Sequence, residues 1–151
     1  MDSNVSGSVV QYNLAFGNDG PGFHAYSSKD NRAHDNNLFR FNVSSNNARK
    51  KHDGGELDIH GIRLLRLQAY NNTLVATDAT GPPPTTAVRL ANRHPEGVVL
   101  RNNIVVTESG PLITANHDYA PGQVMMQGND YHSTQRRLDP GMGGPHVPRP
   151  R

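Results

Sequence analysis

The sequence contains no cysteine and no tryptophan among its 151 residues, and hydrophobic residues make up only 34% of it. Without cysteine the chain forms neither a disulfide framework nor a thiolate metal site, so packing and backbone pairing have to stabilise it. No apolar run approaches the length of a membrane-spanning helix. The N-terminus shows no basic segment followed by an apolar stretch, so no export signal is visible. The length of 151 residues allows at most one domain.

The excess of one sign of charge over the other is also small. The formal net charge is +2, and the pI of about 9.2 comes partly from arginines near the C-terminus. This bias is too weak to indicate a nucleic-acid partner. What the chain has in quantity is glycine (15 residues), proline (11 residues) and asparagine, which favour turns and irregular connections over long amphipathic helices.

A repeat organises the chain. Short apolar segments reach an asparagine four positions after their first residue, and the last, weaker copy ends on Gly128 with its asparagine at position 129. Successive anchors lie 29, 29, 31 and 26 residues apart. A period in the range of twenty to fifty residues indicates a solenoid. The segments are Val9–Asn13, Leu38–Asn42, Leu67–Asn71, Val98–Asn102 and Val124–Gly128.

The local pattern indicates strands. A second segment in each repeat alternates apolar and polar residues with a period of two, which suits a strand with one buried face. The spacing of three and four residues that a helix needs is missing. The residues expected on the inner face are Phe23, Ala25, Leu57, Ile59, Val88 and Leu90. The sequence therefore predicts an all-β solenoid in which each strand pairs with its counterpart in the next coil, about 4.8 Å away.

The recurring asparagines have a structural explanation. Stacked side-chain amides bond to one another along the column and so satisfy buried polar groups. Asparagine also tolerates the left-handed backbone of a sharp bend. We expect Asn13, Asn42, Asn71 and Asn102 to form this ladder, in place of a ligand-binding role.

Several pieces of the chain carry a family resemblance: Val10–Ala15 with Gly17–Phe23, Phe41–Asn47, Tyr70–Val75 and Val99–Val105. They resemble coils of bacterial right-handed parallel β-helix repeat proteins of the pectin-lyase-like superfamily. The resemblance implies a right-handed parallel β-helix of about five coils over residues 9–133. It implies a secreted or periplasmic protein, and this chain resembles a C-terminal fragment of such a protein. Residues 1–8 are expected to be disordered or a partial edge, and residues 134–151 to be a disordered tail rich in proline, glycine and arginine.

Outward residues of the second strands should form two columns along the coils. The first column is His24, Asp58, Arg89 and Thr114, and the second is Tyr26, His60, Ala91 and Asn116. The resemblance adds that enzymes of the superfamily hold a sugar chain along such a face. Elimination on a uronate polymer needs a base and a cation that stabilises enolate-like charge. His60 or His24 supplies the base in this hypothesis, and Arg89 supplies the cation.

Other assignments stay open. A glycoside hydrolase needs two carboxyl groups, and Asp58 has only Asp53 and Glu56 nearby in sequence. Tyr119 is a candidate for stacking on a sugar, with Tyr26, Thr114 and Asn116 as further substrate-binding candidates. No cofactor is expected, although Asp53–Glu56 offers a weak calcium site. The two functional hypotheses are a polysaccharide-binding or polysaccharide-processing protein, lyase-like or hydrolase-like, and a non-catalytic structural or adhesion segment. Neither involves a nucleic acid or a membrane.

Overall fold

The computed structural model describes residues 1, 4–28, 34–50, 54–77 and 85–134. In these ranges the chain is all-β and contains no helix, so no helix there is able to span a membrane. The strands are β1 (Val9–Gln11), β2 (Leu14–Phe16), β3 (Phe23–Ser27), β4 (Leu38–Arg40), β5 (Val43–Ser45), β6 (Gly55–Leu65), β7 (Gln68–Tyr70), β8 (Thr73–Ala76), β9 (Thr86–Glu96), β10 (Val98–Arg101), β11 (Ile104–Thr107), β12 (Ile113–Ala115), β13 (Val124–Gln127) and β14 (Asp130–Ser133). The C-terminal tail expected at residues 134–151 lies outside the described residues except for Thr134.

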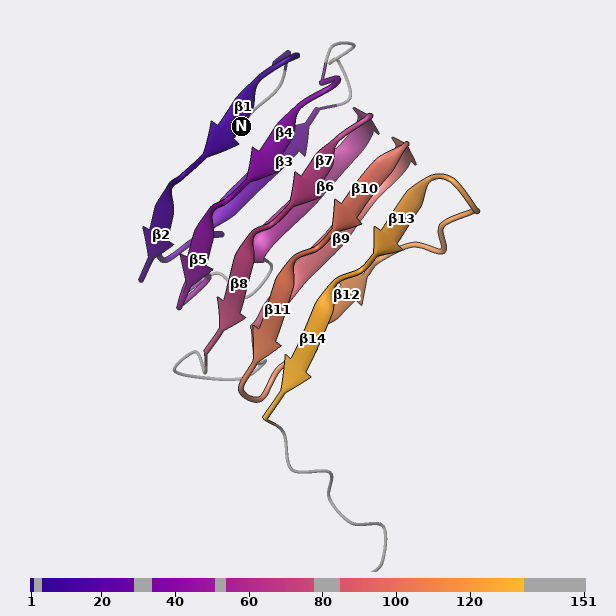
Figure 1. Cartoon of the computed structure of the whole chain (residues 1–151). Helices are drawn as coiled ribbons and strands as arrows, with labels where there is room; N and C mark the ends of the chain where they lie inside the picture. Colours follow the sequence, from indigo (N-terminus) through magenta and orange to yellow (C-terminus); the bar gives the residue numbers. More distant parts are fainter. Residues whose placement is uncertain (2–3, 29–33, 51–53, 78–84, 135–151) are drawn as a thin grey trace, which may run out of the picture.

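Consecutive strands belong to different sheets, and every strand pairing is parallel. The orders are β1-β4-β7-β10-β13, β2-β5-β8-β11-β14 and β3-β6-β9-β12. Each coil therefore contributes one strand to each sheet, and the coils lie one beside the next (Figure 1). The five expected coils appear as five strands in two sheets and four in the third, so the chain completes about four turns. The predicted all-β parallel solenoid is confirmed.

The inward faces of the three sheets form one continuous core. Where parallel sheets cover one another's inner faces, they bury apolar side chains in columns, with one residue from each coil. The inward orientation that was expected for six second-strand residues is confirmed. Five of them are at most 2% exposed, and the sixth, Phe23, packs on the edge of the core against Phe39 with ring centroids 6.2 Å apart. The other two sheets contribute the buried residues Phe39, Ala69, Leu74, Leu100 and Val105.

An asparagine ladder crosses all five coils at the bend between the first two sheets. The Nδ2 of each member donates to the Oδ1 of the next, at distances of 3.1, 3.0, 3.0 and 2.9 Å. Each Oδ1 also accepts the backbone N–H of the preceding member. The amide groups of the three inner members are buried yet fully bonded. The members are Asn13, Asn42, Asn72, Asn103 and Asn129.

The ladder assignment was wrong by one position in two coils. Asn71 and Asn102 precede the ladder residues, are exposed and have φ values of 54° and 52°. They supply the left-handed bend, for which the first two coils use Tyr12 and Phe41, with φ values of 58° and 54°. The two properties that were attributed to one asparagine are therefore divided between neighbouring residues. The bend tolerates several residue types, whereas the ladder position holds asparagine in every coil.

The second strands of the two middle coils are longer than the sequence indicated. Alternation marked only Leu57, Ile59, Val88 and Leu90 as inward strand residues there, but β6 and β9 each span 11 residues and pair as far as Leu65 and Glu96. Both bend where Gly61 pairs with Asn92, because Gly61 has a φ of 109°. The buried Asn92 donates to the His60 carbonyl at 3.3 Å, which binds the bend to the adjacent coil. The extension carries additional side chains onto the outer surface.

Candidate functional site

The outer face of the sheet β3-β6-β9-β12 carries both predicted columns. In the strand register His24 lies opposite Asp58, Asp58 opposite Arg89, and Arg89 opposite Thr114. Tyr26, His60 and Ala91 form the second column in the same way. Because neighbouring parallel strands lie about 4.8 Å apart, side chains in one column are within contact distance.

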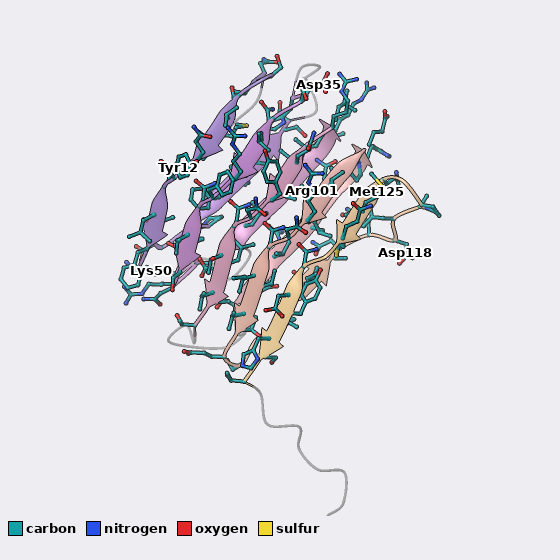
Figure 2. All side chains as sticks on the ribbon, in the orientation of Figure 1. Tyr12, Asp35, Lys50, Arg101, Asp118 and Met125 are labelled. Atoms are coloured by element: carbon teal, nitrogen blue, oxygen red, sulfur yellow. The ribbon has the colours of Figure 1, made fainter. Side chains whose placement is uncertain are left out.

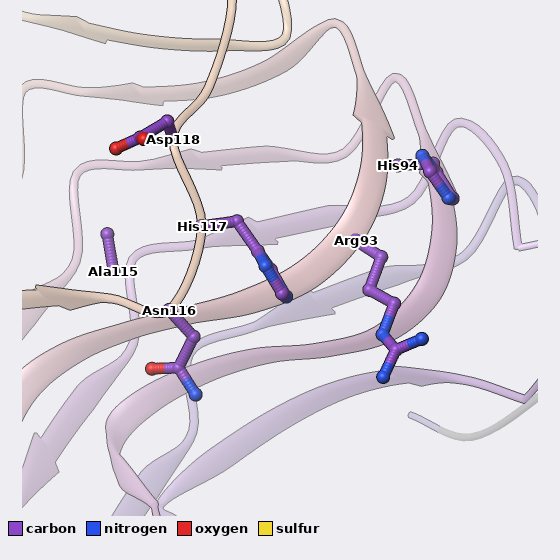
Figure 3. Close-up of a pocket in the computed structure, with 6 residues that line it drawn as sticks. All are labelled: Arg93, His94, Ala115, Asn116, His117 and Asp118. Atoms are coloured by element: carbon purple, nitrogen blue, oxygen red, sulfur yellow. The ribbon is translucent and has the colours of Figure 1, made fainter.

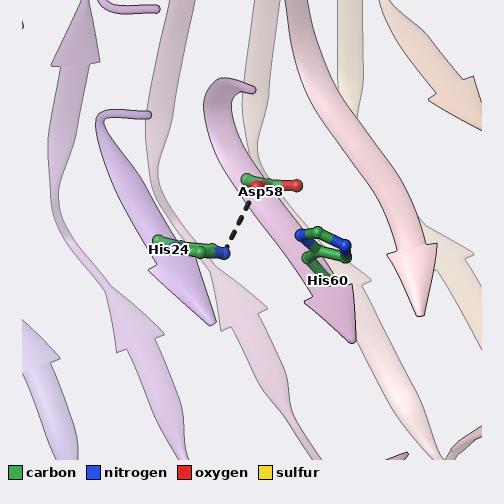
Figure 4. A group of neighbouring side chains, drawn as sticks. All are labelled: His24, Asp58 and His60. Atoms are coloured by element: carbon green, nitrogen blue, oxygen red, sulfur yellow. Dashed lines mark ion pairs between the residues drawn. The ribbon is translucent and has the colours of Figure 1, made fainter. Parts of the chain in front are cut away.

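Asp58 is the centre of a charge cluster. Its side chain is 3% exposed, with the His24 Nε2 at 3.3 Å from Oδ2 and the Arg89 Nη1 at 3.3 Å from Oδ1. Burying a carboxylate is costly unless cationic or hydrogen-bonding partners compensate its charge. Figure 4 shows His24, Asp58 and His60 projecting from β3 and β6 toward one another. The structure thus brings together all four residues that were predicted for catalysis.

Three rings surround this carboxylate cluster on one side. The centroids of His24 and Tyr26 are 5.6 Å apart, those of Tyr26 and His60 5.6 Å, and those of His24 and His60 6.1 Å. All three residues are partly exposed. The cluster therefore presents two imidazoles and one phenol to solvent above a buried carboxylate.

Two adjoining hollows open beside the cluster. The first, which we call the His60 hollow, has a volume of about 520 Å³ and is lined by Tyr26, Ser27, Ser28, His60, Gly61, Ile62, Ala91 and Arg93. The second, the His117 hollow, has a volume of about 740 Å³ and is lined by Arg93, His94, Ala115, Asn116, His117 and Asp118. Arg93 lines both hollows, so they adjoin each other on the outer surface.

The charged lining of the His117 hollow comes from β9 and the loop after β12. Figure 3 shows Arg93 and His117 pointing to the same side of the sheet, while the Asp118 carboxylate points away from them. Sequence reasoning missed Arg93, His94 and His117 as site residues. The first two lie on the extension of β9 beyond the alternating segment, and His117 lies in a turn whose Tyr119 was chosen instead.

The remaining candidates are divided between the surface and the core. Asn116 lines the His117 hollow, and Thr114 pairs with Arg89 at the edge of the cluster. Tyr119 lies elsewhere: its ring packs against the core, and its hydroxyl donates to the Asn92 carbonyl at 3.0 Å. Burial raises the pKa of the Tyr119 hydroxyl above its ordinary value. The Tyr119 ring therefore supports the bend of β9.

Glu56 is directed into the solenoid and away from Asp58. It is fully buried, its Oε2 accepts from Ser44 Oγ at 2.6 Å and from Asn47 Nδ2 at 2.6 Å, and its Oε1 accepts the Asn47 N–H at 3.0 Å. All of these contacts are internal. Glu56 therefore does not form a surface carboxyl pair with Asp58 or contribute to a surface calcium site, and Asp53 lies outside the described residues.

Glu56 gives a pH-dependent contribution to stability. Burial raises its pKa above the ordinary value of 4.5, although the bonds from Ser44 and Asn47 oppose this. The folded state thus binds the proton more tightly than the unfolded state, so the contribution is complete below pH 4.5 and is lost as the pH rises through the folded pKa. Relative to Glu56→Gln, which does not titrate, the wild type should lose free energy of unfolding over this window. Urea denaturation from pH 4 to 8 measures the difference, and a constant difference would contradict the assignment.

A second surface, on the outer side of the first two sheets, is apolar and cationic. Tyr12 and Phe41 stack with centroids 5.4 Å apart, and the Arg101 guanidinium lies 4.9 Å from the centroid of the Tyr70 ring. Tyr12 is 74% exposed. Figure 2 shows Tyr12 and Arg101 on this side of the molecule. Arg40 adds to this surface, because its Nη1 donates to the Tyr70 hydroxyl at 3.0 Å and its guanidinium lies 5.8 Å from the centroid of the Phe41 ring.

Comparison of the chain with protein-family models, with curated proteins and with solved structures gave no match.

Proposed function

We propose that this chain is a carbohydrate-active β-solenoid of the pectin-lyase-like kind, exported from the cell, that binds an acidic polysaccharide and cleaves it by elimination. The observation that carries the proposal is the contact among His24, Asp58, Arg89 and His60 on one outward face, beside two adjoining open hollows. A sugar chain is long and narrow, so open hollows that lie side by side suit it better than a closed pocket does.

The lining of the His117 hollow favours an anionic sugar. Arg93, His94 and His117 are exposed there against a single carboxylate, Asp118. Guanidinium groups bind carboxylates through paired hydrogen bonds, which suits the carboxylate of a uronate. Tyr26 presents a partly exposed ring beside His60, where a sugar ring has space to pack.

The chemistry follows from the position of His60. Its imidazole lines the hollow and would accept the proton on the carbon next to the uronate carboxylate. The bond from the neighbouring carbon to the glycosidic oxygen then breaks, a carbon–carbon double bond forms, and His60 returns the proton to the leaving oxygen. Arg89, oriented by Asp58, stabilises the negative charge that develops on the carboxylate. Hydrolysis is less well supported, because Glu56 points inward.

A second candidate function is binding without cleavage, in adhesion or in a structural role. One observation favours it: Arg89 is only 14% exposed and is compensated by Asp58, as in an ion pair that stabilises a sheet. In that case the hollows still hold the polysaccharide, but no bond breaks.

His60→Ala and Arg89→Ala are expected to lower the rate of elimination by roughly 100-fold or more, because each removes a group that acts on the reacting proton or charge. The ultraviolet absorbance of unsaturated chain ends, measured on a panel of acidic and neutral polysaccharides, gives the rate. His132→Ala, on the exposed strand β14, is the matched control and should leave it unchanged.

Two further measurements complete this test. Circular dichroism and Arg89→Lys separate a chemical loss from a folding defect, since lysine keeps the charge beside Asp58. A folded wild type that binds an acidic polysaccharide without forming unsaturated ends would favour the second function. A folded wild type that neither binds nor cleaves any of the polymers would contradict both.

A further inference from the structure

The cluster at Asp58 is suited to a ligand smaller than a sugar. His24, Asp58 and His60 each offer one metal-ligating atom, and these atoms all lie within 4.8 Å of one another. In the part of the chain that the structure describes, no other group of three or more histidine or acidic residues meets this criterion. Strand alternation placed these residues on one face as catalytic candidates, and the distances between their side-chain atoms are what indicate a shared metal ion.

The distance between His24 Nε2 and Asp58 Oδ2 is informative. At 3.3 Å it is longer than a typical charge-assisted hydrogen bond, which measures about 2.7–2.9 Å. Two ligands of a tetrahedral ion with bonds of about 2.0–2.1 Å lie roughly 3.3–3.4 Å apart. The pair therefore already has the separation of two ligands on one ion, and His60 is close enough to reach the same ion by side-chain rotation.

The surroundings hold these ligands in place. β3 and β6 pair in register, which fixes His24 opposite Asp58, and His60 lies two residues further along the same face. Arg89 Nη1 donates to both oxygens of Asp58, at 3.3 Å to Oδ1 and 3.5 Å to Oδ2, and Oδ2 also lies 3.3 Å from His24 Nε2. An outer partner that orients a ligating carboxylate is a recurring arrangement in metal sites.

We infer that His24, Asp58 and His60 bind a divalent transition-metal ion of the zinc type. Two imidazoles and one carboxylate suit zinc, whereas calcium and magnesium prefer sites made entirely of oxygen. Three protein ligands leave a fourth position for water, and one of the three, His60, also lines the His60 hollow. The site joins the first and second coils through one ion.

This inference does not rest on the proposed function, since metal binding is measured without a polysaccharide. It does affect that function. A bound ion takes the imidazole lone pair with which His60 would accept a proton, so zinc should inhibit elimination. The metal-loaded and metal-free proteins are then different functional states of one site.

The test is isothermal titration calorimetry of the full chain, freed of metal by chelator and dialysis, with zinc chloride. We expect one zinc ion per chain, and affinities at least tenfold weaker in His24→Ala and His60→Ala. His117→Ala, on the neighbouring hollow, is the matched control and should bind like the wild type. Cobalt(II) in place of zinc should give the intense visible absorption of a four-coordinate ion in the wild type and lose it in His60→Ala.

Several outcomes would overturn the site. Absence of saturable binding by the wild type would do so, as would equal zinc affinity in the wild type and both histidine variants. Asp58→Asn keeps the shape of the side chain, and unchanged zinc affinity in this variant would also contradict the site. Because His60 is partly exposed, His60→Ala is expected to fold, and circular dichroism checks this. Failure to cleave polysaccharides leaves these results unaffected, so the two proposals fail separately.

Discussion

Asn72→Ala is expected to lower the free energy of unfolding by about 2–6 kcal/mol, because it leaves two buried groups unbonded at about 1–3 kcal/mol each. Those groups are the Asn42 N–H, which donates to Asn72 Oδ1 at 3.1 Å, and the Phe39 carbonyl, which accepts from Asn72 Nδ2 at 3.1 Å. The Asn42 Nδ2 also loses one of its two acceptors and keeps the Val10 carbonyl. Asn72 is the middle of five ladder members, so both adjoining coils are affected. Chemical denaturation followed by circular dichroism measures the loss.

The adjacent residue provides the control. Asn71 is exposed and has a φ of 54°, which glycine adopts readily. Asn71→Gly should therefore change the free energy of unfolding by less than about 1 kcal/mol. Equal losses in Asn71→Gly and Asn72→Ala would show that the ladder does not stabilise the fold in the way its hydrogen bonds indicate.

Gly61→Ala is expected to destabilise the solenoid by about 3 kcal/mol or more, since overpacking and an unsuitable backbone angle act together. Gly61 has a φ of 109°, and a Cβ built on it would lie 2.0 Å from the Ser27 carbonyl oxygen. That oxygen belongs to the backbone of the adjacent coil, so β3 and β6 would have to separate. Thermal unfolding by calorimetry measures the effect.

Gly20→Ala is the matched glycine substitution. A Cβ at Gly20 would meet no atom within 4 Å, so the midpoint of thermal unfolding should stay close to that of the wild type. A Gly61→Ala variant as stable as Gly20→Ala would mean that the coils are free to move apart at this bend. The hollow beside His60 would then be less rigid than the strand register indicates.

The architecture was accessible from the sequence because each coil repeats the same physical requirement. An apolar residue is needed at the same inward place in every strand, and this leaves a visible period of about 30 residues. The exact ladder residue was not accessible. Where two asparagines are adjacent, as at Asn71 and Asn72, the sequence does not show which one turns inward, and only the hydrogen bonds decide.

The candidate site could be predicted in part for a related reason. Strand alternation and register placed His24, Asp58, His60 and Arg89 on one face, and the structure brings them into contact. Arg93 was missed because β9 continues through a bend, where the period of two is interrupted at Asn92. The burial of Glu56 was missed because its partners, Ser44 on β5 and Asn47 just after β5, come from another part of the coil.

The order of the sheets also determines how the molecule would respond to a mechanical load. β1 and β14 lie in the first and last coils, and every coil pairs only with the coils beside it (Figure 1). A force pulling these ends apart therefore acts on one boundary between coils at a time. Each boundary that opens would release about 30 residues, or roughly 100 Å of extended chain. The protein would lengthen in discrete steps, one for each coil.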